Sequence, residues 1–473
     1  MRGFTLLILV TMSVTSAYEL GNPMNQGISG LAGNGITDIL ASRGTLWFGT
    51  GYGLSFTADD GLSFTSLGAS HGLGRGSVSA LYVGGDTVIV ATASDTLIES
   101  SGGELIYGSG LSLSLDGGLT WEYQSQPPPG FTPVQNVTYD IAVLEGTVWI
   151  VSFGGGLLKS EDGLRTWEVV TPDTLIFDPG GNLNHRAFAC CAVDGVLWVG
   201  TAGGINKSTD NGATWTNFSY NSQEYSISGN FIVAMAGQPL GEEQIIWAAT
   251  WKAEGEDEFY AVSKSANNGA TWETVLHDQK AHNFAFDDSV VYVAADAGLY
   301  KSVDLGRTWY LFPPIRDSVT GDVVYTTEAY SVYARDGVVW VGTADGLART
   351  RDNGYTWEVF RAFRSTAAKG SPRTYAYPNP FSPTRHNLLN GEGHVRLQYN
   401  TLNSTRVTIR IYDFAMDLVT TVVENHPRPG KGDYSEVWEG RNDYGDYVAN
   451  GVYFYSVELE GDGTYWGKVM IVN

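Results

Sequence analysis

Cysteine is nearly absent from this sequence of 473 residues. The only two cysteines, Cys190 and Cys191, are adjacent and therefore cannot cross-link distant parts of the chain. We interpret them as successive residues of a β-strand that point to opposite faces, rather than as a redox pair. The fold is therefore expected to hold without disulfide bonds.

Basic residues are scarce as well. The chain has 28 Lys and Arg against 51 Asp and Glu, which gives a formal net charge of −23. A phosphate backbone requires a basic face, so this balance argues against nucleic acid as a partner. The acidic residues are spread along the chain, and we interpret them as a source of solubility rather than as one binding surface.

Long apolar runs are missing after the N-terminus, where no segment reaches the roughly 18 apolar residues that a membrane-spanning helix needs. The N-terminus itself has the pattern of a secretory signal peptide. Arg2 supplies a positive charge, Phe4–Met12 is mostly apolar, and small residues precede Tyr18. We predict a signal peptide at residues 1–17 and a mature protein that is secreted or held at the cell surface, without a transmembrane segment.

Motifs for metals and cofactors are also lacking. The seven histidines are scattered, and we interpret His277 and His282 as parts of a solvated polar loop. The sequence contains no Gly-x-Ser-x-Gly elbow, no phosphate-binding loop and no Cys/His metal spacing. We therefore expect neither a metal nor a cofactor.

A repeated turn is the main positive feature of the sequence. In Ser208–Trp215 the Asp-Asn-Gly segment indicates a tight turn, because glycine accepts positive φ and the carboxylate can accept nearby backbone N–H groups. Trp215 then opens the next strand with a large apolar side chain to bury. Related stretches begin at residues 57, 114, 160, 208, 265, 302 and 350, which lie 37 to 57 residues apart.

The copies share an acid or amide at the third position and an aromatic residue at the eighth. The third positions are Asp59, Asp116, Asp162, Asp210, Asn267, Asp304 and Asp352. The tryptophans at the eighth position are Trp121, Trp167, Trp215, Trp272, Trp309 and Trp357. Seven units of four short strands predict an all-β fold, a seven-bladed β-propeller over residues 18–362. No strand exchange between the first and last blades is evident, although residues 18–30 are candidates for one.

This repeat resembles the Asp-box, or bacterial neuraminidase repeat, over about residues 30–360. Sialidases, sortilin-type receptors, xyloglucanases and the seven-bladed photosystem II stability and assembly factors carry it. The resemblance implies a propeller in which each box holds a hairpin at the blade periphery, away from any active site. It indicates the fold and does not choose a function.

A second domain follows a Ser-, Ala-, Lys- and Pro-rich stretch, which predicts a linker at residues 363–374. Short alternating strands with regular turns at 375–473 predict a small β-sandwich. Tyr377–Phe381, Ile411–Asp413 and Gly451–Tyr455 resemble the Ig-like domain of flagellar hook-capping proteins and the sorting domains of type IX secretion cargo. That resemblance implies an Ig-like sandwich, contact with secretion machinery and delivery to the outside of a diderm bacterium.

Ligand contacts are expected on one face of the propeller. Because strands alternate in direction, the repeated turns lie on one rim, and the second-to-third loops and the blade connections lie on the opposite face. Propellers bind ligands there, around the channel mouth. The predicted contacts are Tyr52, Phe153, His185, Arg186, Tyr220, Tyr225 and Trp251. The alternative is that several of them pack between blades.

Two functions fit these observations. We favour a non-enzymatic binding protein for a protein or polysaccharide at the cell surface. The alternative is a secreted glycoside hydrolase, sialidase-like or other, that uses loop-face carboxylates. The candidates for that role are Asp140, Glu224, Asp296 and Glu328. The absence of an Arg-Ile-Pro motif and the count of seven units rather than six argue against a sialidase.

Overall fold

The computed structural model describes residues 30–97, 104–127, 136–241, 243–253, 255, 257–362, 366, 372–389 and 391–472. The chain divides into two compact units between Ala362 and Phe363. The predicted signal peptide, residues 18–29 and most of the predicted linker lie outside the described residues. Within the described residues, no helix is both long and apolar enough to cross a membrane.

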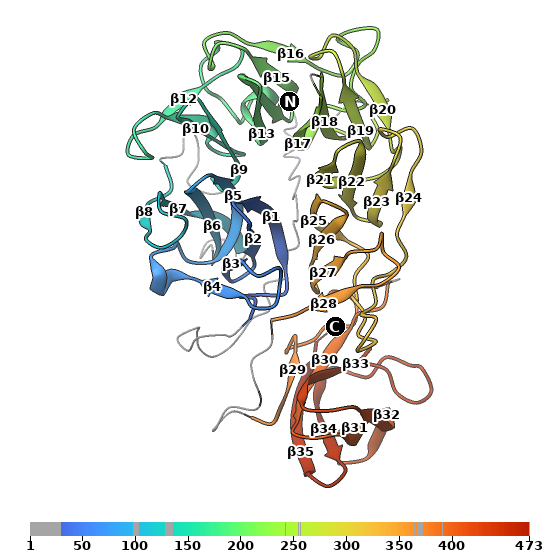
Figure 1. Cartoon of the computed structure of the whole chain (residues 1–473). Helices are drawn as coiled ribbons and strands as arrows, with labels where there is room; N and C mark the ends of the chain where they lie inside the picture. The colour runs from blue at the N-terminus through green and yellow to red at the C-terminus, as the bar shows by residue number, and fades with distance from the viewer. Residues whose placement is uncertain are drawn as a thin grey trace, which may run out of the picture. The chain divides into compact units, whose positions relative to one another are not determined.

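The first unit consists of seven antiparallel sheets of four strands, arranged as blades around a channel (Figure 1). Blade 1 contains β1 (Ile36–Ser42), β2 (Thr45–Thr50), β3 (Gly53–Thr57) and β4 (Thr65–Leu67). Blade 2 contains β5 (Ser77–Gly84), β6 (Thr87–Leu97), β7 (Glu104–Ser114) and β8 (Glu122–Gln124). Blade 3 contains β9 (Thr138–Leu144), β10 (Thr147–Ser152), β11 (Gly156–Ser160) and β12 (Glu168–Val170).

The remaining blades repeat this order. Blade 4 contains β13 (Ala187–Val193), β14 (Val196–Thr201), β15 (Gly204–Ser208) and β16 (Thr216–Phe218). Blade 5 contains β17 (Phe231–Leu240), β18 (Glu243–Trp251), β19 (Ala261–Ser265) and β20 (Glu273–Val275). Blade 6 contains β21 (Ala281–Asp287), β22 (Val290–Ala295), β23 (Gly298–Ser302) and β24 (Tyr310–Leu311). Blade 7 contains β25 (Ala329–Arg335), β26 (Val338–Thr343), β27 (Gly346–Thr350) and β28 (Glu358–Phe360). Two short 3₁₀ helices, η1 (Ala69–His71) and η2 (Leu183–His185), lie in blade connections.

The second unit is a β-sandwich. One sheet has the order β29 (Thr374–Tyr377), β30 (Val395–Thr401), β33 (Gly432–Trp438). The other has the order β32 (Leu418–Arg428), β31 (Thr405–Tyr412), β34 (Gly451–Leu459), β35 (Gly463–Ile471). Residues of both sheets, among them Leu397, Ile409 and Tyr455, share one buried core. The predicted fold class, a seven-bladed propeller followed by a small sandwich, is confirmed.

The repeated turns are closed by side-chain hydrogen bonds. In blade 4 Asp210 accepts the backbone N–H of Thr214 (2.8 Å) and the Thr214 hydroxyl (2.6 Å), and the Ser208 hydroxyl accepts the N–H of Gly212 (2.8 Å). These bonds to the ionised form lower the pKa of Asp210 to about 2. Asn267 keeps the pattern in blade 5, because its Oδ1 accepts the Thr271 N–H while its Nδ2 donates to the Thr271 hydroxyl.

Each of these turns also contacts the preceding blade. A Cβ atom on Gly212, whose φ is +85°, would lie 2.4 Å from the ring of Trp149 in blade 3. Gly118 faces Trp47 in the same way, at 2.5 Å. In four blades the turn glycine thus packs against the buried second-strand tryptophan of the neighbouring blade, whereas Gly269 and Gly354 pack against Phe218 and Phe312.

In blade 3 the turn residue is large, and the second-strand residue of blade 2 that it contacts is smaller than tryptophan. Leu164, with φ +70°, occupies the turn position that is glycine elsewhere, and its N–H donates to Ser160 Oγ as in the other copies. Its side chain is buried in one cluster with Ile89 of β6, which stands in blade 2 where blade 1 has Trp47. A large turn residue above a smaller strand residue fills the same space as glycine above tryptophan.

The ring closes between blades 7 and 1 without strand exchange among the described residues. β1 lies next to β25, and the rings of Phe48 and Trp340 lie 5.7 Å apart. Asn34 joins the two ends, because its Oδ1 accepts the Ala362 N–H (2.6 Å) and its backbone carbonyl accepts the Gly346 N–H (2.9 Å). Side chains and one lead-in residue therefore hold this seam.

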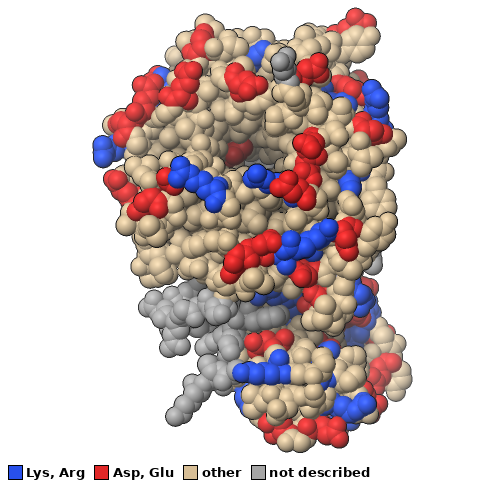
Figure 2. Space-filling view, in the orientation of Figure 1, with Lys and Arg blue, Asp and Glu red and all other residues tan. Residues whose placement is uncertain are grey.

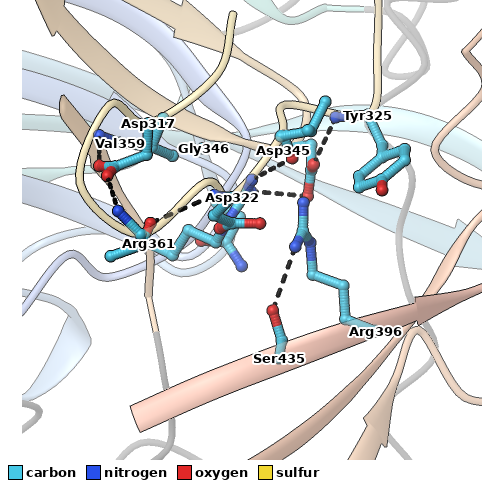
Figure 3. A network of polar contacts seen from close by, with 12 residues as sticks. Asp317, Asp322, Tyr325, Asp345, Gly346, Val359, Arg361, Arg396 and Ser435 are labelled. Carbon is cyan, nitrogen blue, oxygen red and sulfur yellow. Dashed lines mark hydrogen bonds and ion pairs between the residues drawn. The ribbon is translucent and has the colours of Figure 1, made fainter. Parts of the chain in front are cut away.

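A buried ion network fixes the long connection that precedes β25 (Figure 3). Arg361, directly after β28, is 1% exposed at its side chain and contacts Asp322 and Asp345, each at 2.8 Å. Asp345 accepts the N–H of Tyr325 (2.8 Å), and Asp317 accepts the N–H of Val359 (2.9 Å). The connection is thus held against the outermost strand of its own blade.

Candidate functional site

An extra residue interrupts the first strand of every blade at the same place. Near the beginning of each first strand the ladder to the second strand skips one residue. Such a β-bulge redirects the side chain at that point. The extra residues are Thr37, Ser79, Tyr139, Phe188, Val233, His282 and Tyr330. First strands begin on the face opposite the repeated turns, here called the loop face, so all seven surround the channel mouth on that face.

Aromatic rings form a continuous arc along this mouth from blade 3 to blade 7. The Phe188 ring lies 5.6 Å from Tyr139 and 4.6 Å from Phe231, as ring centroids. Trp251 continues the arc at 6.1 Å from Phe231 and 5.7 Å from His282. The His282 ring then lies 5.8 Å from Tyr330. We call these residues, together with Phe153, the aromatic arc.

Two predicted contact residues belong to the arc. Phe153 and Trp251 both stand at the end of the second strand of their blade, and both are half-buried. Phe153 lies 6.1 Å from Phe188, and the Arg186 guanidinium lies 5.3 Å from its ring centroid. Both residues pack between blades, as the alternative expected, and both remain partly exposed, so their role as ligand contacts stays a prediction.

A polar cluster lies at the blade 6 and 7 end of the arc. His282 Nε2 lies 2.6 Å from Asp296 Oδ1, and Lys280 Nζ lies 3.8 Å from the other oxygen of Asp296. The Lys280 ammonium also lies 5.5 Å from the Trp251 ring centroid and 5.2 Å from that of Tyr260. Beside them the Tyr330 hydroxyl donates to Glu328 at 2.6 Å.

The sequence interpretation of His282 as a loop residue is wrong. His282 is the second residue of β21, and its ring lies between Trp251 and Tyr330. The apolar alternation at Phe284 and Phe286 was the signal for this strand. His277 does lie in the connection, where its ring stacks on Phe259 at 5.5 Å.

Two carboxylates line the channel below the arc. Asp38 accepts the N–H of Ile39, and Asp140 accepts those of Ile141 and Cys190, at 2.8 to 2.9 Å. Burial raises the pKa of each carboxyl to about 7, and the charge of Asp38 adds to the rise at Asp140. Acidic side chains are visible inside the central hollow in Figure 2.

The three tyrosines predicted as contacts lie elsewhere. The Tyr52 ring, in the turn between β2 and β3, packs over the backbone of Gly33. Tyr220 donates its backbone N–H to Asn230 within the connection before β17. The Tyr225 carbonyl accepts the N–H of Trp272, directly before β20, so this exposed residue lies toward the outer edge of blade 5.

His185 is a structural residue, which corrects its prediction as a contact. Its side chain is 0% exposed and lies 2.9 Å from Asp173. Its Nδ1 accepts the N–H of Asp178, and its ring stacks on Phe177. These bonds fold the connection between blades 3 and 4 and leave no surface for a ligand.

Of the four carboxylates considered for hydrolysis, Asp296 and Glu328 lie at the arc and Asp140 lies in the channel. Glu224 is exposed in the connection between β16 and β17. Among the described residues, no three His, Cys, Asp or Glu side chains gather closely enough to hold a metal ion. Cys190 and Cys191 are free thiols that pack into different core clusters, as their interpretation as successive strand residues requires.

The chain matches no protein-family model and no curated protein sequence. Among solved structures it is similar to the GH74 enzyme of Niastella koreensis, with 13% sequence identity and a TM-score of 0.51 over 94% of this chain and 75% of that one. PorZ, a surface component of the type-IX secretion system of Porphyromonas gingivalis, matches with 16% identity and a TM-score of 0.39 over 92% of this chain and 65% of PorZ. YCF48 from Cyanidioschyzon merolae matches with 16% identity and a TM-score of 0.43 over 72% of this chain and 97% of YCF48. This chain thus spans less than two thirds of PorZ, and identities this low indicate a shared fold alone.

Proposed function

We propose that this chain is a non-enzymatic binding protein whose loop face engages an extended ligand, a polysaccharide or a protein, at the cell envelope. The aromatic arc is the observation that carries the proposal. It spans five blades of the channel mouth. Phe188 and Phe231 are buried within it, and its half-buried rings give contact area at little cost in side-chain entropy; these are Tyr139, Phe153, Trp251, His282 and Tyr330. A ligand that follows it is longer than a single small molecule.

The carboxylates of the site support binding rather than hydrolysis. Two-carboxylate hydrolysis needs one acid held protonated beside the scissile bond and one ionised partner across it. Asp296 Oδ1 lies 2.6 Å from His282 Nε2, and Glu328 accepts the Tyr330 hydroxyl at 2.6 Å, so each of these carboxylates already has a side-chain partner. Asp140 has a raised pKa, yet it lies below the arc inside the channel.

We also propose that the protein acts outside the cell. The predicted signal peptide at residues 1–17 and the resemblance of the C-terminal sandwich to hook-cap and type IX sorting domains support export from a diderm bacterium. In this proposal the sandwich serves secretion or surface attachment, and the propeller serves binding.

The test is retention of the full chain on a panel of soluble and insoluble polysaccharides, read for both bound protein and released sugar. A Phe153→Ala, Arg186→Ala double variant is expected to lose most of the retention, because it removes a half-buried ring of the arc and the half-buried guanidinium beside it. Tyr225→Ala, at the outer edge of blade 5, is the matched control and is expected to bind normally.

Sugar release that is lost on changing Asp296 or Glu328 would overturn the non-enzymatic proposal and favour the glycoside hydrolase. If no polysaccharide is retained, crosslinking in the native cell should capture a protein partner through the arc. Retention that is indifferent to the arc variant would place binding elsewhere.

A further inference from the structure

The blade 5 to 7 end of the arc combines an aromatic floor with polar groups that have unused hydrogen-bonding capacity. Trp251, Tyr260, His282 and Tyr330 supply the rings. Lys280 and Asp296 each keep 41% of their side chains exposed. We call Lys280, Asp296 and Glu328, with the rings between them, the polar end of the arc.

The side chains of Asp296, Glu328 and Lys280 can each form further hydrogen bonds. Asp296 uses Oδ1 for His282, and its Oδ2 lies 3.8 Å from Lys280, too far for a hydrogen bond. Glu328 uses Oε2 for Tyr330. Among the described residues, the Lys280 ammonium makes ring contacts and this one long ion pair but no hydrogen bond. Two carboxylates and one ammonium therefore keep hydrogen-bonding capacity at this end of the arc.

We propose that the polar end of the arc is a subsite for a neutral polysaccharide, an inference that rests on the proposed binding function. A sugar ring carries C–H groups on one face, which pack on aromatic rings, and hydroxyls at its edge. A hydroxyl donates to a carboxylate and accepts from an ammonium. Neighbouring hydroxyls of a sugar can therefore bind the carboxylates of Asp296 and Glu328 and the ammonium of Lys280. These charge-assisted bonds are stronger than bonds between neutral groups.

The charge balance selects neutral sugars over acidic ones. The polar end carries two carboxylates, those of Asp296 and Glu328, against the one ammonium of Lys280. A uronate or sulfate group would meet like charge here, and like charges in a partly desolvated site weaken binding. The length of the arc toward Tyr139 leaves room for several sugar residues in a row.

The test measures dissociation constants of the full chain for neutral probes, namely galactomannan, xyloglucan and a mixed-linkage β-glucan, and for the anionic probes alginate and polygalacturonate. At least one neutral probe is expected to bind, and the anionic probes are expected to bind at least tenfold more weakly. Lys280→Ala and Glu328→Gln are each expected to weaken binding about tenfold.

Lys301→Ala is the matched control. Lys301 also lies over an aromatic ring, at 5.6 Å from the centroid of Tyr292, but outside the arc. Its removal should leave the dissociation constant unchanged, and thermal unfolding of all variants verifies that they are folded.

The outcomes separate this inference from the proposed function. Binding of a neutral probe that the Phe153→Ala, Arg186→Ala variant weakens but the Lys280 and Glu328 variants do not would overturn the subsite and leave the proposed function standing. Preference for an anionic probe, or binding of none of the neutral probes, would overturn the sugar class. Binding unaffected by both sets of variants would overturn both proposals.

Discussion

At the scale of single residues, the ionised aspartate of the repeated turn stabilises the folded state. Five of the turn aspartates, Asp59, Asp116, Asp162, Asp210 and Asp304, have a pKa lowered to about 2, and that of Asp352 is also lowered. The cause in each copy is a set of bonds from the following Ser or Thr and from the backbone. Because a group whose pKa is lowered on folding stabilises the fold above its unfolded pKa, this contribution is lost as pH falls from about 4 through 2.

Replacing one turn aspartate should therefore change stability in a pH-dependent way. Asp210→Asn is expected to lower the midpoint of thermal unfolding at pH 7, and its difference from the unmodified protein should shrink toward pH 2.5. Asn267→Asp is the reciprocal control, and it should raise the midpoint at pH 7. A difference that is equal at both pH values would contradict the role of the charge.

At the scale of the element, the turn is also a contact between blades. Its sequence predicts the hairpin, because Asp, Asn and Gly favour tight turns through their own backbone conformation and their bonds to nearby backbone groups. The partner of the glycine is a tryptophan that lies 63 residues earlier for Gly212 and Trp149. No local pattern links the two, so this contact could not be predicted.

A comparison of Gly212→Ala with Gly146→Ala separates the energetic cost of the contact with Trp149 from the cost of positive φ at alanine. We expect Gly212→Ala to destabilise the propeller by more than about 2 kcal/mol, since it adds a left-handed alanine and a clash with Trp149. Gly146 has nearly the same φ, +86°, with nothing within 4 Å of a Cβ, so Gly146→Ala should cost about 1 kcal/mol. Chemical denaturation measures both, and equal losses would rule out the contact.

The bulges were the element that the sequence interpretation missed. A one-residue insertion near the start of a strand leaves most of the apolar alternation intact. The first strands were therefore predicted, but the bulge that redirects one side chain of each strand at the channel mouth was not. The arc depends on those inserted residues. For this reason the position of the loops was enough to select Phe153, Arg186 and Trp251 as candidates. The inserted residues of the arc could be recognised only from the strand register; they are Tyr139, Phe188, His282 and Tyr330.

At the scale of the whole molecule, the propeller has one seam that differs from its other blade contacts. Six neighbouring pairs of blades are joined by the chain itself, and the seventh is joined by side chains of blades 7 and 1 and by Asn34. The sequence predicted the number of blades from its repeats. It could not show this closure, because Asn34 and Ala362 are 328 residues apart.

Asn34→Ala should loosen that seam selectively. It leaves the N–H of Ala362 without its acceptor, which costs about 1–3 kcal/mol when the group stays buried. Hydrogen exchange is expected to rise in β1 and β25 and to stay unchanged in β13 and β14. Asn217→Ala, a change of an exposed side chain within blade 4, is the control. A uniform rise along the chain would argue against a local seam.

A ring closed in this way has a genetic consequence. Every blade is one continuous stretch of the chain, so duplication or deletion of the sequence of one repeat would add or remove a complete blade and never half of one. The boundaries of the repeats in the sequence are thus also the boundaries of the blades, and each blade contributes its own residue to the lining of the mouth.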